Sequence, residues 1–388
     1  MPTCPERARP ERRGPPGGSP VLLAAALGGL ACATPGGAFR PEALEPVRLP
    51  GAHEQRFFIQ EENDVFGITR QSDNYYTQGL RLGARWKPRA DLRLVRQEGA
   101  SELWGFELGQ NIYTPNDIRL TDLGVLRRDR PYAGYLYVGP TFDLRWRWNP
   151  IPRWARIRAG AGETDEAFSS TLHLEARLGQ TGPSALGGAV QTGFHVLLRD
   201  IAGNDSQALP AGWRLYETAN ARSVDITVEY AADWIRIGAP VAWLNLTHCT
   251  GSRLAVRVLP GARLDLGGIV DAAGLGLEAR AGLAEADVGS PSATSRPRTP
   301  LELYLWGRAQ GRFVAYSRLI EGRLLDGVTT EVGLRRWVGD VTAGLTLRVF
   351  ALEFVAAQQW RTAEIEPLPA GTSATDNFGS FQISFLFY

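Results

Sequence analysis

His195 is the side chain of this 388-residue sequence best suited to acid–base chemistry, because an imidazole changes charge near neutral pH. The chain contains four histidines. His195 lies in a segment with helical spacing, with Gln191 one turn before it and Arg199 one turn after it. A single histidine on a helix is more often structural than catalytic. A general-base role therefore depends on which other polar groups the fold brings near it.

A polar cluster early in the chain offers oxygen atoms. It comprises Glu61-Glu62-Asn63-Asp64 and the stretch from Ser72 to Gly79, which includes Thr77. Carboxylate, amide and hydroxyl oxygens are ligands that calcium prefers. The same composition fits an acidic loop that is simply solvated. A calcium site is one of two interpretations at this point.

A second cluster combines polar residues with arginines. It runs from Asn111 to Asp117 and continues from Arg127 through Asp129 and Arg130 to Gly134. Arginines beside a membrane can hold lipid phosphates. They can equally be ordinary loop charges, and composition does not separate the two.

Strands must position these groups, because short segments alternate apolar and polar residues with a period of two. Examples are Leu80–Trp86, Val224–Tyr230 and Leu345–Val349. The chain ends on an alternating segment, Phe381 to Tyr388, whose last residue is aromatic, as in barrels recognised by the barrel assembly machinery. The pattern predicts an all-β fold, a transmembrane antiparallel β-barrel in the bacterial outer membrane.

The N-terminus predicts export. Basic residues from Arg7 to Arg13 precede the uncharged run Pro20–Ala33, which closes on Ala31-Cys32-Ala33. We expect a signal peptide over residues 1–33, a linker over 34–54 and the barrel over 55–388; lipidation of Cys32 is the alternative. Cleavage would leave Cys249 as the only cysteine, which excludes an intramolecular disulfide. A net charge of +1 without a long basic block predicts no nucleic-acid partner.

One stretch breaks the strand pattern. Apolar residues recur with helical spacing from Pro183 to Arg199, and Pro183 suits a helix start. We expect an infolded helix over about 183–200, in an extracellular loop folded into the barrel or against its rim. Charges of both signs at the expected lumen positions, such as Arg85 and Asp143, favour a filled barrel over a wide pore.

Taken together, the clusters resemble the LpxR family of lipid A 3′-O-deacylases. The resemblance covers roughly residues 55 to 215 and rests on linked motifs in a fixed order. These are Glu62-Asn63-Asp64, Asp73-x-Tyr75-Tyr76-Thr77-x-Gly79-Leu80, Asn111-Ile112-Tyr113-Thr114-Pro115, Asp129-Arg130-Pro131-Tyr132-Ala133-Gly134, and Gly182-Pro183-Ser184-Ala185-Leu186-Gly187 leading to Gln191 and His195.

The resemblance implies about 12 strands and a calcium-dependent carboxylic ester hydrolase that removes the acyloxyacyl chain from the 3′ position of lipid A. The family's active-site positions fall on Asn63, Asp64, Thr77 and His195. The implied mechanism has His195 activating a water while Ca2+, held partly by Asp64, stabilises the oxyanion.

Two further site residues are assigned from the resemblance. The family's acid after the histidine has no direct counterpart, because Arg199 and Ile201 stand at the expected places. Asp205 is ranked first as the second metal ligand, and Asp200 is its rival. Arg119 matches a basic position and is expected to contact substrate. Trp213 matches the family, whereas Tyr216 stands where a glutamine is usual.

Three functions remain open on the sequence. The first is the lipid A deacylase, with lipopolysaccharide as substrate. The second is a barrel that has lost catalysis and serves a structural or binding role, suggested by the altered stretch from Arg199 to Asp205. The third is an outer-membrane esterase acting on phospholipid.

Overall fold

A computed structural model describes residues 52–67, 75–97, 100–160, 168–202, 208–240, 253–284 and 301–387. The expected signal peptide lies outside these ranges, as do Asp205 and Cys249.

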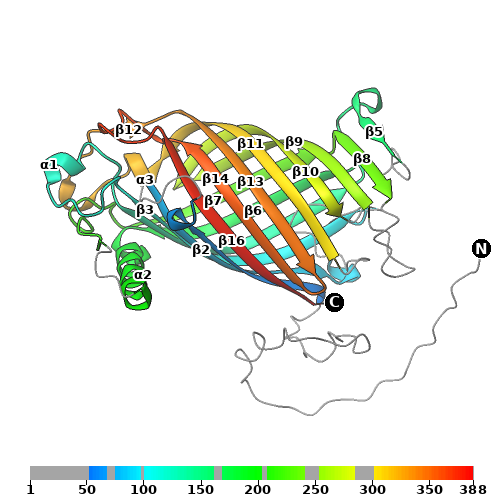
Figure 1. The fold of residues 1–388 in the computed structure, drawn as a ribbon, viewed down its shortest axis with the longest axis horizontal. Coiled ribbons are helices and arrows are strands. Elements are labelled where there is room, and N and C mark those ends of the chain that lie inside the picture. The colour runs from blue at the N-terminus through cyan, green and yellow to red at the C-terminus, as the bar shows by residue number, and fades with distance from the viewer. Residues whose placement is uncertain are drawn as a thin grey trace, which may run out of the picture. The chain divides into compact units, whose positions relative to one another are not determined.

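Twelve strands of this part of the chain form a closed antiparallel barrel (Figure 1). Each strand pairs with its neighbour in sequence, and the last pairs with the first in the register Asn63↔Gly379 to Gln55↔Phe387. Closure leaves every strand of the wall with a partner on both sides, as a sheet in lipid requires. The strands are β1 (Ala52–Asn63), β2 (Tyr75–Pro88), β3 (Ser101–Thr114), β4 (Ala133–Trp146), β6 (Ser170–Thr181), β7 (Ala221–Ala232), β9 (Arg253–Gly267), β10 (Val270–Ala284), β11 (Leu301–Ser317), β13 (Trp337–Val349), β14 (Leu352–Thr362) and β16 (Thr375–Phe387).

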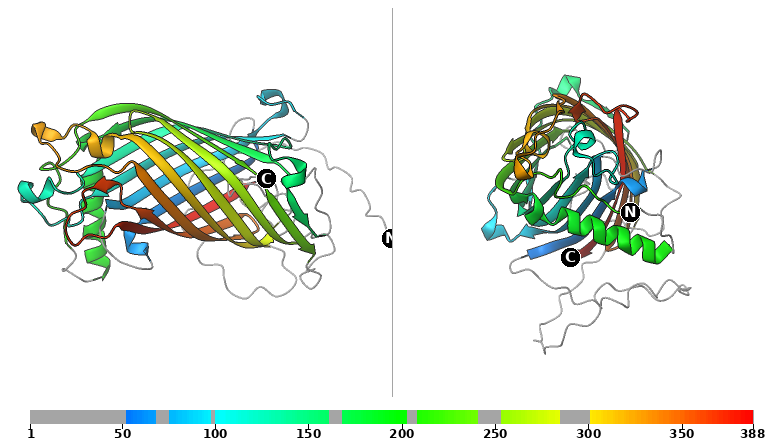
Figure 2. Two further views of the ribbon diagram at one scale, coloured as in Figure 1. Left: turned by 90° about the horizontal axis from the view of Figure 1, so that it is seen from above. Right: turned by 90° about the vertical axis from the view of Figure 1, so that its left-hand side faces the viewer.

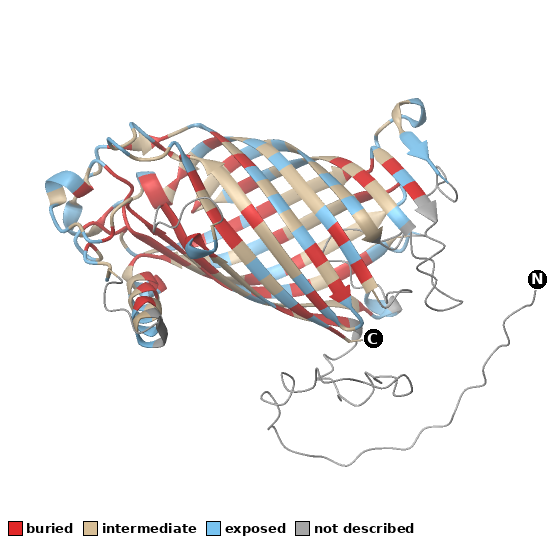
Figure 3. Ribbon diagram, viewed as in Figure 1, coloured by how far each residue is buried: buried red, intermediate tan, exposed pale blue. Residues whose placement is uncertain are grey.

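Side chains alternate between the two faces of the wall, which gives the banded pattern of Figure 3. On β7, Val224 and Ile226 are 63% and 48% exposed, whereas Asp225 and Thr227, which alternate with them, are buried. Apolar residues facing outward and polar residues facing inward are the arrangement of a membrane barrel. The period-two prediction is thereby confirmed.

The lumen is filled by paired charges. Arg85 contacts Glu107 at 2.7 Å and Asp143 at 3.2 Å, and Arg56 contacts Glu353 at 2.5 Å. Apolar side chains pack at the mouth where the long loops lie, including Leu319 and Ile320 of helix α3 (Arg318–Glu321). Inside the barrel the charges therefore neutralise one another, and the mouth is packed. The expectation of a filled barrel is met.

The two ends of the barrel differ. Both chain ends of the described barrel, at β1 and β16, lie at one end, and the loops carrying most helices lie at the other (Figures 1 and 2). Outer-membrane barrels have short periplasmic turns and longer extracellular loops. The helix-bearing end is thus the extracellular one. Its shorter elements are α1 (Leu123–Leu126), β12 (Gly333–Leu334), β15 (Ile365–Glu366) and the 3-10 helices Asp64–Phe66, Pro183–Ala185 and Leu325–Gly327.

Helix α2 (Gly187–Ala202) packs against the barrel rim beside β3 and β4, one of the two placements expected (Figure 2). None of the described helices is both long and apolar enough to cross a membrane. The apolar stripe of α2 is not its buried face: Leu186, just before it, and Leu197 are 55% and 51% exposed, whereas Gln191 and His195 are buried. The helix turns its polar side to the wall and its apolar side outward.

A small extension stands at the periplasmic end. Strand β8 (Ile235–Pro240) pairs with Arg253–Val258 of β9, and β5 (Ile157–Ala159) pairs in parallel with β8. The remaining 3-10 helices, Ala90–Leu92 and Arg153–Ala155, lie in turns at this end.

Candidate functional site

Asn63 lies on the outer side of the barrel wall, at the extracellular rim. On β1 the side chains of Arg56, Phe58, Gln60 and Glu62 line cavities inside the barrel. Successive side chains on a strand point to opposite faces, so Asn63 faces outward. It is nevertheless only 2% exposed. Something outside the barrel covers it.

Asn63 also starts the 3-10 helix that positions Asp64. Its side-chain Oδ1 accepts a hydrogen bond from the backbone N–H of Val65 at 2.9 Å, which is N-capping. Asp64 is the first residue of this helix and is 1% exposed. The Asn-Asp pair thus places a buried carboxylate where β1 leaves the wall.

Thr77 reaches the same outer side through an irregularity in β2. The pairing of β2 with β3 shifts register between Tyr76 and Gln78, so Thr77 is an extra residue in the ladder. Its hydroxyl lies 2.7 Å from the hydroxyl of Thr114. Thr114 follows the outward positions of Phe106 and Leu108 on β3 with a period of two. The bulge directs the Thr77 hydroxyl toward the outer face.

The loop from β6 into α2 lies on the outer side of the wall, against β3 and β4. Gln110 of β3, which also faces outward, donates from Nε2 to the backbone oxygen of Ala185 at 2.5 Å. A Cβ atom on Gly134 of β4 would lie 3.2 Å from both Ala185 Cβ and Gly187 Cα. Backbone therefore meets backbone here, which only glycine permits without displacement. The start of the helix is fixed on the outside of the wall.

Trp213 packs against the same buried face of the helix. A Cβ on Gly187 would come within 2.8 Å of its ring, and its indole Nε1 donates to Gln191 Oε1 at 2.8 Å. The ring also packs on Tyr132, with centroids 4.9 Å apart. Gln191 and His195 are consequently held on the buried face, one turn apart. Within the described residues, Gln191 Nε2 is buried without a hydrogen-bond acceptor.

The backbone fixes the tautomer of His195. Its Nδ1 lies 2.6 Å from the carbonyl oxygen of Ala208. A carbonyl only accepts, so Nδ1 carries the proton and donates it. In the neutral ring Nε2 is then the unprotonated nitrogen. Burial of 98% of the side chain leaves that lone pair inside the covered site rather than in water.

Two further predicted residues, Arg119 and Asp200, are exposed. Arg119 lies in the β3–β4 loop, where its exposed guanidinium binds Asp117 with an Nε–Oδ1 distance of 2.9 Å. This pairing lowers the pKa of Asp117. The same loop contacts the chain after α2, because Ala211 N–H donates to Ile118 O at 2.8 Å. Asp200 is exposed near the end of α2, and Asp205 lies outside the described residues.

The arginine-rich motif before β4 braces the loops. Arg130 is buried, stacks on Tyr113 at 4.2 Å and contacts Glu364 at 2.7 Å. Burial alone would raise the pKa of Glu364, but Arg130 and two further arginines lower it to about 2. Asp129 accepts the backbone N–H groups of Asn116 and Arg130 at 2.8 and 2.7 Å. The loop-charge interpretation therefore holds for Arg130, which has a structural partner rather than a lipid phosphate.

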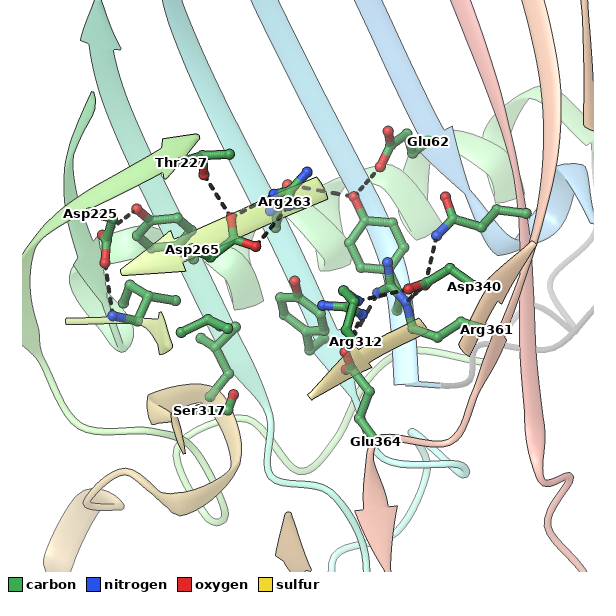
Figure 4. Close-up of a pocket in the computed structure, with 18 of the residues that line it drawn as sticks. Glu62, Asp225, Thr227, Arg263, Asp265, Arg312, Ser317, Asp340, Arg361 and Glu364 are labelled. Carbon is green, nitrogen blue, oxygen red and sulfur yellow. Dashed lines mark hydrogen bonds and ion pairs between the residues drawn. The ribbon is translucent and has the colours of Figure 1, made fainter. Parts of the chain in front are cut away.

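One of the cavities inside the barrel is a separate feature. It measures about 330 Å³ and is lined by charged groups such as Glu62, Arg263, Asp340 and Glu364 (Figure 4). Asn63, Asp64, Thr77 and His195 are absent from its lining. Asn63 and Thr77 lie instead on the outer side of the wall, Asp64 follows Asn63 in the 3-10 helix, and His195 lies on α2, which packs beside β3 and β4.

The sequence interpretation missed Gln110 and did not assign the positioning roles of Trp213 and Gly134. Gln110 and Trp213 hold the helix by hydrogen bonds, and Gly134 permits its close approach. A period-two register count from Phe106 would have placed Gln110 and Thr114 on the lipid side. Polar residues at outward positions near a strand end are a signal that something covers them.

Comparison with known proteins matches this architecture. The family described as "Outer membrane protein LpxR" matches residues 22–147 and 155–387. LpxR from Salmonella typhimurium is 17% identical, with a TM-score of 0.61 over 86% of this chain and 100% of that chain. The β domain of the Bordetella autotransporter BrkA is 9% identical, with a TM-score of 0.36 over 86% of this chain and 97% of that chain. No curated protein matches.

The family match spans most of the chain, including both halves of the barrel and the loop with α2. It agrees with the closed barrel. The chain belongs to the LpxR family of outer membrane proteins.

Proposed function

We propose that this protein hydrolyses the 3′-O-linked acyloxyacyl ester of lipid A, using a water molecule activated by His195. One observation carries the proposal above the others. His195, with its ring proton fixed on Nδ1, is buried on α2, which packs beside β3 and β4 at the extracellular rim, and Asn63 and Thr77 lie on the outward side of the adjoining strands β1 and β2. A membrane lipid can reach that side without entering the barrel.

The location fits the substrate. Lipid A occupies the outer leaflet, so its sugars and ester bonds lie at the depth of the extracellular rim. The outward face below the rim is apolar, with Leu82, Phe106 and Leu108 between 42% and 49% exposed. Acyl chains would lie along this face while the ester reaches the covered patch. The ester bond of lipid A would therefore reach the proposed site where the barrel wall meets the lipid.

His195 supplies the base. Nε2 accepts a proton from water as the water oxygen bonds to the ester carbonyl carbon, while Nδ1–H keeps its bond to Ala208 O and steadies the ring. Collapse of the tetrahedral intermediate breaks the bond between the acyl carbon and the sugar oxygen. The proton passes from Nε2 to that oxygen. The products are a carboxylic acid and a free 3′ hydroxyl.

The neighbouring polar groups have supporting roles. Gln191 shares the buried face with His195, and its amide is oriented by Trp213, so Nε2 presents a donor in the covered site. The Thr77 and Thr114 hydroxyls are hydrogen-bonded to each other across the adjacent strands β2 and β3. Donors held in advance, with water excluded, stabilise charge that develops on a carbonyl oxygen.

The proposal includes calcium. Asn63, Asp64 and Thr77 offer amide, carboxylate and hydroxyl oxygens, a hard donor set that suits Ca2+ rather than zinc. Bound Ca2+ would stabilise the oxyanion of the ester carbonyl. Asp64 and Asp205 are the proposed acidic ligands. In the part of the chain that the structure describes, no group of three or more His, Cys, Asp or Glu side chains could hold a metal.

Purified protein in detergent tests this proposal. With mixed micelles of lipopolysaccharide and phospholipid, we expect fatty acid release from lipopolysaccharide in calcium and its loss in a calcium chelator. His195→Ala should reduce the rate by at least about 100-fold, the scale of a general base. Release from phospholipid alone would instead identify the esterase alternative. If the protein migrates on a gel as a folded barrel but releases fatty acid from neither lipid, it is an inactive barrel.

A further inference from the structure

A segment at the periplasmic end takes no part in the proposed active site. It runs from Arg147, just after β4, through the 3-10 helix Arg153–Ala155 to Ala159 at the end of β5. The family match stops at residue 147 and resumes at residue 155. The function of this segment must therefore be argued from its own side chains.

The segment is held in a fixed shape by buried polar contacts. Asn149 Nδ2 donates to the backbone oxygen of Asp233 at 2.8 Å, and Asn149 Oδ1 accepts from Ile151 N–H at 2.9 Å. Arg156 donates to the backbone oxygens of Ile151 and Asn149 at 2.7 and 3.0 Å. Trp234 Nε1 donates to Ala155 O at 3.1 Å. These bonds present the tip of the turn on a stable platform.

That platform displays aromatic and cationic side chains. Trp154 at the tip is 88% exposed and Trp148 is 56% exposed. Arg147 and Arg153 are exposed as well. Between residues 147 and 160 the charged side chains are four arginines, with no aspartate or glutamate. Exposed tryptophan beside arginine is the composition of a membrane interface rather than of a water-facing turn.

The outer face of the extension continues the lipid-facing wall. Ile157 pairs with Ile235, and Ile237 pairs with Val256 of β9. Ile157 and Ile237 are 48% and 40% exposed and lie on the same face, which is also the face of the outward apolar residues of β9. Arg236 points to the opposite face, where it contacts the buried Asp233 at 3.3 Å. β5 therefore adds Ile157 to the apolar face of β8, at the end of the barrel where Figure 1 shows the two strands.

We propose that residues 147–158 bind the headgroups of anionic phospholipids in the periplasmic leaflet. Arg147 and Arg153 contact the lipid phosphates, and Trp154 inserts at the level where headgroups meet acyl chains. Charge complementarity and continuity with the lipid-facing belt select this occupant. The surface is separate from the site at His195, so the proposal stands independently of the deacylase activity.

Native mass spectrometry of the purified full chain, with phosphatidylglycerol and phosphatidylcholine as probes, tests the proposal. We expect the wild-type protein to retain phosphatidylglycerol in preference to phosphatidylcholine. The triple variant Arg147→Gln, Arg153→Gln, Trp154→Ala should bind phosphatidylglycerol roughly tenfold more weakly, because each arginine near an anionic surface contributes severalfold. Arg128→Gln and Trp337→Ala, which change exposed residues at the opposite end, should bind as the wild type does.

Lipopolysaccharide is the second anionic lipid of this membrane and forms another arm of the experiment. Its binding should be unchanged in the triple variant. An equal loss of both lipids, unchanged phosphatidylglycerol binding, or equal wild-type binding of the two phospholipids would overturn the proposal. Folding is checked by heat-modifiable migration on a gel. Should the triple variant fail that check, Arg153→Gln against Arg153→Lys supplies the comparison, and only the glutamine variant should lose binding.

Discussion

At the scale of single residues, the surroundings of His195 give the clearest indication of a catalytic role. The carbonyl of Ala208 assigns the ring proton to Nδ1, and burial keeps Nε2 away from bulk water. The sequence predicted the residue but not this partner, because Ala208 lies thirteen positions further along and carries no polar side chain. Because every residue has a backbone carbonyl, the residue types do not predict which carbonyl accepts such a hydrogen bond.

The acid that completes the metal site is a residue-scale question that substitution resolves. Asp200 is exposed near the end of α2. We therefore predict that Asp200→Asn leaves calcium-dependent hydrolysis within about twofold of wild type, as exposed substitutions away from a site do. Asp205→Asn should raise the calcium concentration needed for half-maximal rate by tenfold or more, because it removes a charged ligand.

Calcium titration of the hydrolysis rate makes the comparison, with Asp64→Asn as the positive control. The assignment of Asp205 is contradicted if the Asp200 variant loses its calcium response and the Asp205 variant keeps it.

At the scale of elements, the placement of α2 shows where prediction from sequence reaches its limit. The helical spacing from Pro183 onward was sufficient to predict the helix. Its apolar stripe suggested a buried face, since soluble helices bury their apolar side. Here the outer surroundings are lipid, so the apolar side faces outward and the polar side, with Gln191 and His195, faces the wall. The environment outside the fold decides which face is covered.

Close approach of backbones fixes this helix, and a side chain at that contact should release it. We predict that Gly134→Val abolishes hydrolysis while the barrel stays folded, because its Cβ would press on Ala185 and Gly187. Gly193→Ala on the exposed face of α2 is the matched control, with no atom within 4 Å of the new Cβ. It should keep full activity and stabilise the helix by about 0.5–1 kcal/mol. Heat-modifiable migration and rate are measured together.

A buried carboxyl in the loop after α2 should give that loop a pH dependence. Burial raises the pKa of Glu217 to about 7, above the ordinary value near 4.3. The folded loop then binds more protons than the open one between these values, so its stability falls as pH rises through that window. Glu217→Gln stays neutral and can still accept from Arg214 N–H, the bond that Glu217 makes at 3.2 Å.

Limited proteolysis of this loop at pH 5 and pH 8 measures the effect, with each variant compared with wild type at the same pH. We expect slower cleavage of the Gln variant at pH 8 and a much smaller difference between the two proteins at pH 5. Faster cleavage of the variant at pH 8 would contradict the assignment.

At the scale of the whole molecule, alternation and a terminal aromatic strand were enough to predict a closed, filled barrel. They could not say on which side of the wall the site lies. The side depends on the strand register, because the bulge between Tyr76 and Gln78 moves the Thr77 hydroxyl outward. The residue types in this segment do not predict the bulge. The switch from Glu62 inside to Asn63 outside is visible only once β1 is placed in the wall.

The filled lumen carries a stability prediction. Arg56 and Glu353 are 2% and 4% exposed in their side chains, so losing one partner leaves a buried charge. Arg56→Met should destabilise the barrel by about 3–5 kcal/mol, whereas the double variant Arg56→Met, Glu353→Leu should recover most of that loss. Urea unfolding in detergent measures both. A double variant as unstable as the single one would contradict the pairing.

We propose that this barrel is a scaffold that holds a histidine base against its lipid-facing side to cleave lipid A. Mass spectrometry of lipid A extracted from bacteria that express the protein tests it most directly. We predict that the wild type removes one acyloxyacyl group, from the 3′ oxygen, and that cells with a correctly inserted His195→Ala barrel keep it. An unchanged acyl pattern with an inserted wild-type barrel, or deacylation that persists in His195→Ala, would contradict the claim.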